Sequence, residues 1–521
     1  RGVVDMTLPG TPVAVEAGDH DALPWSQIHI GPPEETTITA LVEGKDARTP
    51  EGQACIPDDR LALADWGGGH PPLELLAEAR SGLYGEFDAL VPEAALHAVR
   101  LHLYLGFGAE AAQYADLLAQ IEDDPDLPIL KSMAVLVEGD PDPQSPFLDM
   151  LACDGAAAFW AALAHDEIPP GAQVNGDAIA RNFLSLPPHL RGALGPILTE
   201  KLIAHGDAEA ARIIRDTLGR TPDTPEATMS LLQAKADLHE GAPEAALEHA
   251  AAAVAEDGSG VEEWIALVEA HFRKTEPMST EAAEALGAFE GEMEGAEGSQ
   301  AYFRALALAE ILSGQTDAGF HTAESQGLDL SDPWQSAVVL AKDDAFLRHA
   351  VPLRPESVAP EVATEVARRL EGLGFPDSAL VWLEPIGPKD EPERRRIAAR
   401  AEFARGDAGQ SLTLLEGLEE PEDEELRARG LVQLGRIAEA RTAYQAAGLP
   451  EEALRLAAWE EAWPDLQGAE TPLWAEAVTD SSTEPPEDAG PLARGSALLE
   501  ASAASRASIE ALLAGVSQPG S

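Results

Sequence analysis

Four segments of the chain share one phrase, in which a glycine stands five residues before a small residue within a helix-forming run. They are Gly206-Asp207-Ala208-Glu209-Ala210-Ala211, Gly241-Ala242-Pro243-Glu244-Ala245-Ala246, Gly374-Phe375-Pro376-Asp377-Ser378-Ala379 and Gly435-Arg436-Ile437-Ala438-Glu439-Ala440. Such a glycine suits a tight turn at the end of one helix, and the small residue lets the next helix pack closely against its neighbour. The phrase therefore predicts a helix, a turn and a second helix.

The spacing of the phrase indicates stacked helix pairs. Successive turn glycines are 35 residues apart (206 to 241), 32 apart (374 to 406) and 29 apart (406 to 435), within the range of helical repeats. The small positions continue this register at Ala211, Ala246, Ala283 and Gly319, and after an irregular connection over 326–358 at Ala379, Ser411 and Ala440. The alternative is an Ala-rich helical domain in which glycine precedes alanine through composition alone.

The best copy of the pattern resembles the tetratricopeptide repeat (TPR) family. It places small, large, glycine, small, aromatic and small residues in the family's order, at Ala428, Leu431, Gly435, Ala440, Tyr444 and Ala447. Most of the family's aromatic positions, including its Trp, are missing here, so the chain resembles a divergent member over residues 171–460. The resemblance implies a solenoid of α-helical hairpins that binds a protein or peptide on its surface.

The sequence outside the repeats predicts four further segments. Residues 1–65 contain short β-branched runs between Pro, Gly and Asp, which favours a small β-rich module. The expected organisation is a mainly α protein with that module at 1–65, a helical domain with degenerate repeats at 70–170, a TPR-like solenoid at 171–465, an acidic Pro-containing linker at 466–491 and a C-terminal helix at 492–516.

The charge of the chain limits its partners. With 35 Lys and Arg against 92 Asp and Glu, the net charge is −57 and the isoelectric point is about 4.3. Such a chain repels nucleic-acid phosphates and anionic lipid head groups. Its apolar runs are also too short to cross a bilayer. We therefore expect a protein partner, no nucleic acid and no direct membrane insertion.

The chain contains two cysteines, Cys55 and Cys153. In an exported protein they could form a disulfide, whereas in a reducing compartment they would be two separate thiols. The even pair, together with a first residue that is not Met, favours export to a periplasmic or extracellular location. Abundant Ala and Pro, and Lys that is scarce beside Arg, are typical of a bacterial protein from a high-GC genome.

No catalytic or cofactor motif stands out. The sequence has no Gly-x-Ser-x-Gly elbow, no phosphate-binding loop and no His-Glu-x-x-His. Carboxylate pairs occur throughout so acidic a chain and identify no active site. We therefore expect no enzyme activity, no cofactor and no metal site.

One cluster of cations interrupts the acidic background. It comprises Arg368, Arg369, Arg394, Arg395, Arg396 and Arg400. Stacked helices could bring these guanidinium groups onto one wall that grips a carboxylate-bearing partner. Alternatively, the arginines neutralise local Glu residues through pairs such as Glu391 with Arg395.

These observations lead to one expected function and two alternatives. The expected function is a non-enzymatic, exported bacterial scaffold that binds a protein partner on its solenoid, by analogy within an envelope or motility assembly. The first alternative is an enzyme with its site in residues 1–170. The second is a cytoplasmic regulatory repeat protein.

Overall fold

The structure of the protein is a computed structural model, and most of the chain is helical. It describes residue 49 and residues 52–85, 87, 89–222, 224–256, 259–296, 298–352, 358–386, 391–462, 464, 466, 475, 478–479 and 490–516. These residues contain 25 α-helices that pack mainly in consecutive pairs, which confirms a mainly α fold. The chain divides into two compact units, Arg1–Leu198 and Thr199–Ser521.

The predicted β-rich module is not supported where the structure can be compared with it. Residues 1–48 lie outside the described residues, as does most of the expected linker. Over 52–65 the chain forms two 3-10 helices, η2 (Asp58–Arg60) and η3 (Leu63–Asp65), and no strand. Pro57 and Asp58 are turn-forming residues, and they favour these short turns over an extended strand.

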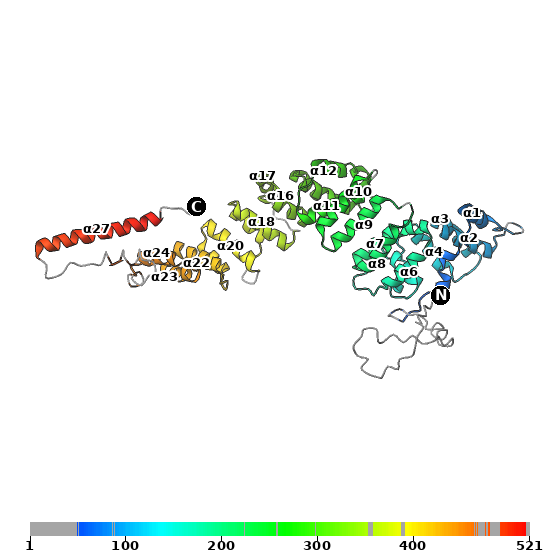
Figure 1. Cartoon of the computed structure of the whole chain (residues 1–521), viewed down its shortest axis with the longest axis horizontal. Helices are drawn as coiled ribbons and strands as arrows, with labels where there is room; N and C mark the ends of the chain where they lie inside the picture. Colours follow the sequence, from blue (N-terminus) through cyan, green and yellow to red (C-terminus); the bar gives the residue numbers. More distant parts are fainter. Residues whose placement is uncertain are drawn as a thin grey trace, which may run out of the picture. The chain divides into compact units, whose positions relative to one another are not determined.

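The α-helices of the first unit pack in chain order, each against the next α-helix (Figure 1). They are α1 (Pro72–Arg80), α2 (Pro92–Leu105), α3 (Gly108–Ala119), α4 (Leu127–Val137), the 3-10 helix η5 (Leu148–Met150), α5 (Ala156–Ala164) and α6 (Gly176–Ser185). The next helix, α7 (Pro188–His205), contains the division between the units. Trp160 of α5 lies at the centre of the core, fully buried beside Phe147 and Phe159.

The second unit is a series of helical hairpins. Its helices after α7 are α8 (Ala208–Leu218), α9 (Glu226–His239), α10 (Pro243–Ala255), α11 (Val261–Lys274), α12 (Thr280–Gly287), α13 (Glu290–Met293), α14 (Ser299–Leu312), α15 (Thr316–Ser325), α16 (Ser331–Leu340), α17 (Asp343–Ala350), α18 (Pro360–Gly372), α19 (Pro376–Leu383), α20 (Pro392–Arg405), α21 (Ala408–Leu414), α22 (Pro421–Gln433), α23 (Ile437–Ala446), α24 (Pro450–Trp459) and α27 (Pro491–Val516). Residues 326–358, expected to be irregular, include the hairpin α16–α17. This hairpin lacks a turn glycine and is held by the buried side chains of Trp334 and Phe346.

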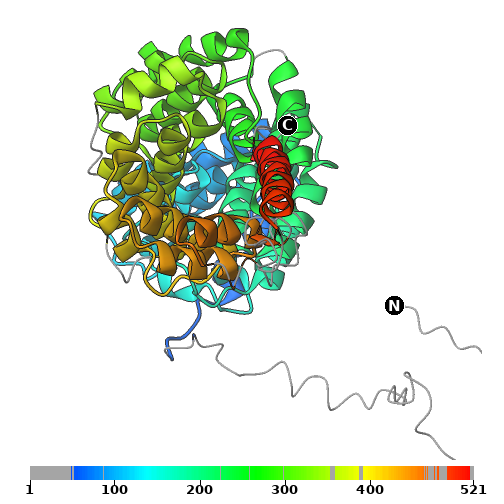
Figure 2. The same ribbon diagram turned by 90° about the vertical axis from the view of Figure 1, so that its left-hand side faces the viewer.

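The first helices of successive hairpins form a continuous layer. Each of α9, α11, α14, α16, α18, α20 and α22 packs against the next member of this series, and we call the series the first-helix layer. In the hairpins α9–α10, α11–α12, α14–α15, α18–α19, α20–α21 and α22–α23, the second helix packs against its own first helix. Figure 2 shows these hairpins following one another around a curve, from green through yellow to orange. Such an array buries one continuous core and leaves a long surface exposed.

Local residues explain where the hairpins turn. Gly206 and Gly406 have φ angles of +92° and +91°, a conformation that favours glycine. The aspartate after each glycine begins the next helix. Asp207 accepts from the Ala210 N–H at 3.1 Å, and Asp407 accepts from the Gln410 N–H at 2.9 Å. The turn phrase is therefore a helix end followed by a helix start.

Small residues sit where the two helices of a hairpin meet. A Cβ atom on Gly319 of α15 would lie 2.6 Å from the backbone oxygen of Ala307 and 2.5 Å from Ile311 Cγ1, both on α14. At the equivalent position of the last hairpin, Ala440 is fully buried and packs with Ala428 and Leu431. The predicted register of small residues therefore coincides with close helix contacts.

Enlarging Ala440 should destabilise the protein. We expect Ala440→Leu to cost about 1–3 kcal/mol of unfolding free energy, because the added atoms must fit between packed helices. Ala438→Leu is the matched control, since Ala438 is exposed on the same helix. Chemical denaturation measures both, and equal stabilities for the two variants would contradict the register.

Candidate functional site

Arg369, on α18, closes the C-terminal end of α16. Its guanidinium donates hydrogen bonds to the backbone oxygens of Ala337 (2.9 Å), Val338 (2.7 Å) and Ala341 (2.6 Å). The same group lies 4.3 Å from the ring centroid of Phe346. Since the last carbonyl groups of a helix have no partner within the helix, Arg369 satisfies an end that would otherwise lack donors.

Two arginines of α20 bind helix ends in the same way. Arg395 is 6% exposed, and it donates to the backbone oxygens of Leu414 at 3.0 Å and Glu416 at 2.5 Å. Arg394 donates to the backbone oxygen of Leu383 at 2.6 Å. The two side chains thus satisfy carbonyl groups at the end of α19 and at and just after the end of α21.

Arg396 joins α20 to α22 through a bidentate ion pair. Its Nε and Nη2 atoms lie 2.8 and 3.0 Å from the two carboxylate oxygens of Asp423. The Asp423 side chain is 2% exposed and also accepts from the Glu420 N–H at 3.2 Å, within the capping box of α22. One buried carboxylate therefore begins a helix and binds the preceding hairpin.

The last two arginines of the cluster join α18 to α20. Arg368 lies 3.2 Å from Glu393, and Arg400 lies 3.3 Å from Glu371. All six predicted arginines thus contact other groups of the chain, mostly on neighbouring hairpins. Partner binding by these residues stays a prediction, while their contacts give them a structural role.

Two further cations bridge the first-helix layer, and the sequence analysis did not single them out. The pairs are Lys235 with Glu200 (2.8 Å) and Glu262 (3.1 Å), and Arg304 with Glu269 (2.9 Å) and Asp332 (2.6 Å). Burial alone would raise the pKa of Glu269, but Arg273 and Arg304 lower it below its usual value. The carboxylate is therefore ionised and held between cations at neutral pH.

A positional signal could have identified Lys235. It stands six residues before the turn glycine Gly241, as Arg368 stands six before Gly374. Because the hairpins repeat, residues at the same distance from the turn occupy similar places in the stack. A cation at this position therefore faces the first helix of a neighbouring hairpin.

His271, on α11, predicts a pH dependence of stability. Burial lowers its pKa below the usual 6.5, because the charged imidazolium is disfavoured there. The unfolded chain binds the proton more readily, so this residue's contribution is present above about pH 6.5 and is lost as the pH falls towards the folded-state value. We expect His271→Gln to lose less stability than the wild type between pH 7 and about pH 5.5 in urea denaturation. Identical pH slopes would contradict this.

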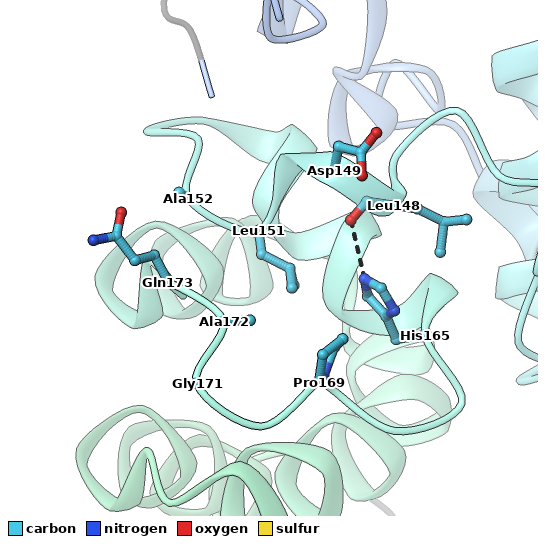
Figure 3. A pocket seen from close by; sticks show the side chains of 9 residues that line it. All are labelled: Leu148, Asp149, Leu151, Ala152, His165, Pro169, Gly171, Ala172 and Gln173. Atoms are coloured by element: carbon cyan, nitrogen blue, oxygen red, sulfur yellow. Dashed lines mark hydrogen bonds between the residues drawn. The ribbon is translucent and has the colours of Figure 1, made fainter. Parts of the chain in front are cut away.

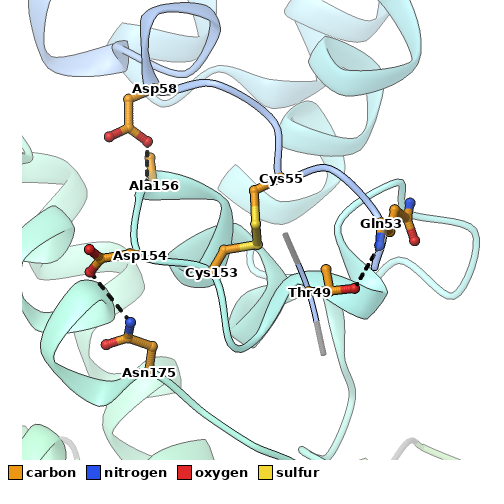
Figure 4. Close-up of a disulfide and its surroundings, with 8 residues drawn as sticks. All are labelled: Thr49, Gln53, Cys55, Asp58, Cys153, Asp154, Ala156 and Asn175. Carbon is orange, nitrogen blue, oxygen red and sulfur yellow. Dashed lines mark hydrogen bonds between the residues drawn. A yellow bond between two sulfur atoms is a disulfide. The ribbon is translucent and has the colours of Figure 1, made fainter. Parts of the chain in front are cut away.

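A disulfide fastens the segment before α1 to the first unit. Cys55 and Cys153 are bonded, with their Cα atoms 6.1 Å apart, within the 7 Å reach of such bonds. Figure 4 shows Asp58 beside this bond, where its carboxylate accepts from the Ala156 N–H at 2.8 Å at the start of α5. The segment is therefore held covalently and by a helix cap that comes from a distant part of the chain.

A pocket of about 410 Å³ lies in the first unit, between η5, the end of α5 and the loop before α6 (Figure 3). Its wall includes the apolar residues Leu151 and Pro169. His165 Nε2 donates to the backbone oxygen of Leu148 at 3.0 Å. Figure 3 shows Asp149, His165 and Gln173 on different parts of the lining of this pocket.

The described part of the chain shows neither a metal site nor a membrane span. Among the described residues, no group of three or more His, Cys, Asp or Glu side chains is arranged to hold a metal ion. None of the described helices combines the length and the apolar character that a membrane span requires. No known family model matches the chain, and no curated protein matches it.

Proposed function

We propose that the protein is a non-enzymatic scaffold that binds a protein partner along the hairpin stack of its second unit. The observation that carries this proposal is the first-helix layer, in which seven helices from α9 to α22 pack in sequence. Stacks of this kind offer long surfaces for extended or helical segments of other proteins.

We further propose that the second unit is a divergent TPR-like solenoid. The support is the agreement between the family's small positions and the close contacts at Gly319 and Ala440. The turn glycines Gly241 and Gly435, which both have a φ of +73°, give the same support.

The proposed location is outside the cytoplasm of a bacterium, in the periplasm or beyond. The disulfide supports it, because structural disulfides persist mainly in oxidising compartments. A place in an envelope or motility assembly is the analogy that suits an acidic scaffold of this kind.

Capture of partners by the full chain tests the proposed function. The tagged protein, expressed in its source organism and cross-linked before lysis, should retain a partner in fixed ratio, and excess untagged protein should displace that partner. Recovery of the chain alone, under conditions that preserve its disulfide and helical content, would contradict the proposal.

A further inference from the structure

A groove of about 610 Å³ lies between the last two complete hairpins of the second unit. Residues of α21, the loop over 415–420, α22 and the start of α23 line it. Its apolar floor includes Leu412, Leu418, Leu431 and Leu434. Leu434 is 47% exposed, although it ends the apolar face of α22. The groove therefore offers an apolar surface that a partner's side chain could cover.

The cations that line the groove already have partners. Arg427 donates to the backbone oxygens of Leu415 (2.8 Å) and Leu418 (2.7 Å), which shapes the loop that forms one wall. Arg436 binds both carboxylate oxygens of Glu439, at 2.7 and 2.5 Å. Both guanidinium groups therefore already contact carbonyl or carboxylate oxygens of the chain itself.

The carboxylates of the loop differ from these paired groups. Glu416 and Glu419 are exposed at the rim of the groove, and neither has an ion pair within the described part of the chain. An apolar floor beneath two such carboxylates complements a segment that carries both apolar and cationic side chains.

We propose that this groove docks a segment of a protein partner that combines a leucine-like side chain with lysine or arginine residues. The apolar side chain covers Leu434, and the cations lie against Glu416 and Glu419. A second copy of the chain does not complement the rim, because it carries the same net charge of −57. This inference rests on the proposed scaffold function, and it names a surface and the chemistry of its partner.

A labelled peptide that alternates lysine and leucine tests the groove, with fluorescence anisotropy on the full chain at 150 mM salt. We expect Glu416→Gln with Glu419→Gln to weaken binding about fivefold, since two exposed ion pairs are lost. Leu434→Ser should weaken it about threefold through the lost apolar contact. A control peptide with serine in place of leucine should bind the wild type and Leu434→Ser with equal affinity.

The matched control separates the groove from the general charge of the protein. Glu244→Gln with Glu248→Gln removes the same charge from exposed positions of α10 and should change binding less than twofold. Equal weakening by both double variants would overturn the proposal, as would no weakening by the groove variants. If the wild type captures a cellular partner and the groove variants retain it fully, the groove is not the docking surface, while the scaffold function stands. If the wild type captures none, the scaffold function itself fails.

Discussion

Reduction of the Cys55–Cys153 bond is expected to lower the unfolding free energy of the first unit by up to about 4.7 kcal/mol. The bonded residues are 98 positions apart, so the bond removes much of the freedom of a long loop in the unfolded chain. The folded segment keeps other anchors after reduction, including the Arg60–Asp126 ion pair, the buried Leu61 and Leu63 and the hydrogen bond from the Ala156 N–H to Asp58. The loss therefore comes mainly from the greater freedom of the unfolded chain.

Hydrogen exchange with and without a reductant measures this effect within one molecule. Amide protection in α5 should fall on reduction and in the variant Cys55→Ser with Cys153→Ser. Protection in α14, which belongs to the second unit, serves as the internal control and should not change. Unchanged protection of α5 in both the reduced protein and the variant would show that the bond does not stabilise the first unit.

Replacement of Arg395 by methionine is expected to cost about 3 kcal/mol. Methionine fills part of the space but donates no hydrogen bond, so the carbonyl groups of Leu414 and Glu416 lose a donor in a buried place. If Arg395 were instead a solvated residue that binds a partner, its removal would leave the melting temperature unchanged.

Arg455→Met is the matched control for this prediction. Arg455 also lies on a helix, but it is 42% exposed, and its ion pair within the described part of the chain is with Glu452, three residues earlier. Such exposed pairs contribute less than about 1 kcal/mol. If thermal unfolding showed that Arg395→Met costs less than about 1 kcal/mol, the proposed role of Arg395 at the helix ends would be wrong.

The repeat register was accessible from the sequence because it depends on local backbone requirements. Gly374 and Gly406 take positive φ angles in the structure, as a turn between helices requires. The buried Ala246 and Ala379 follow such turns at the same distance. A short-range pattern of this kind can be read from the sequence even where few aromatic residues mark the repeat.

The roles of the arginines were not accessible in the same way. Arg369 and the carbonyl group of Ala337 are 32 residues apart in sequence, so their contact depends on how α18 packs against α16. Pairs within one helix are readable from spacing, but most partners of the cluster lie on another hairpin. The groove beside Leu434 likewise depends on the path of the loop over 415–420, which no local pattern predicts.

The scarcity of cations gives their placement a functional meaning. The chain has 35 Lys and Arg against 92 Asp and Glu, and cations such as Lys235, Arg304 and Arg396 lie between consecutive hairpins. There they offset the repulsion between acidic neighbours. The surface outside these contacts is consequently rich in carboxylates, which fits the cationic partner segment proposed above.

We infer that cations between hairpins hold this stack together. A double-mutant cycle on Arg396 and Asp423 tests it most directly, with unfolding free energies measured for Arg396→Ala, Asp423→Ala and the double variant. Because Asp423 is buried, we predict that Arg396→Ala alone costs about 3 kcal/mol and that the coupling energy is about 2 kcal/mol. A coupling energy near zero, with Arg396→Ala as mild as the exposed change Arg455→Ala, would contradict the account.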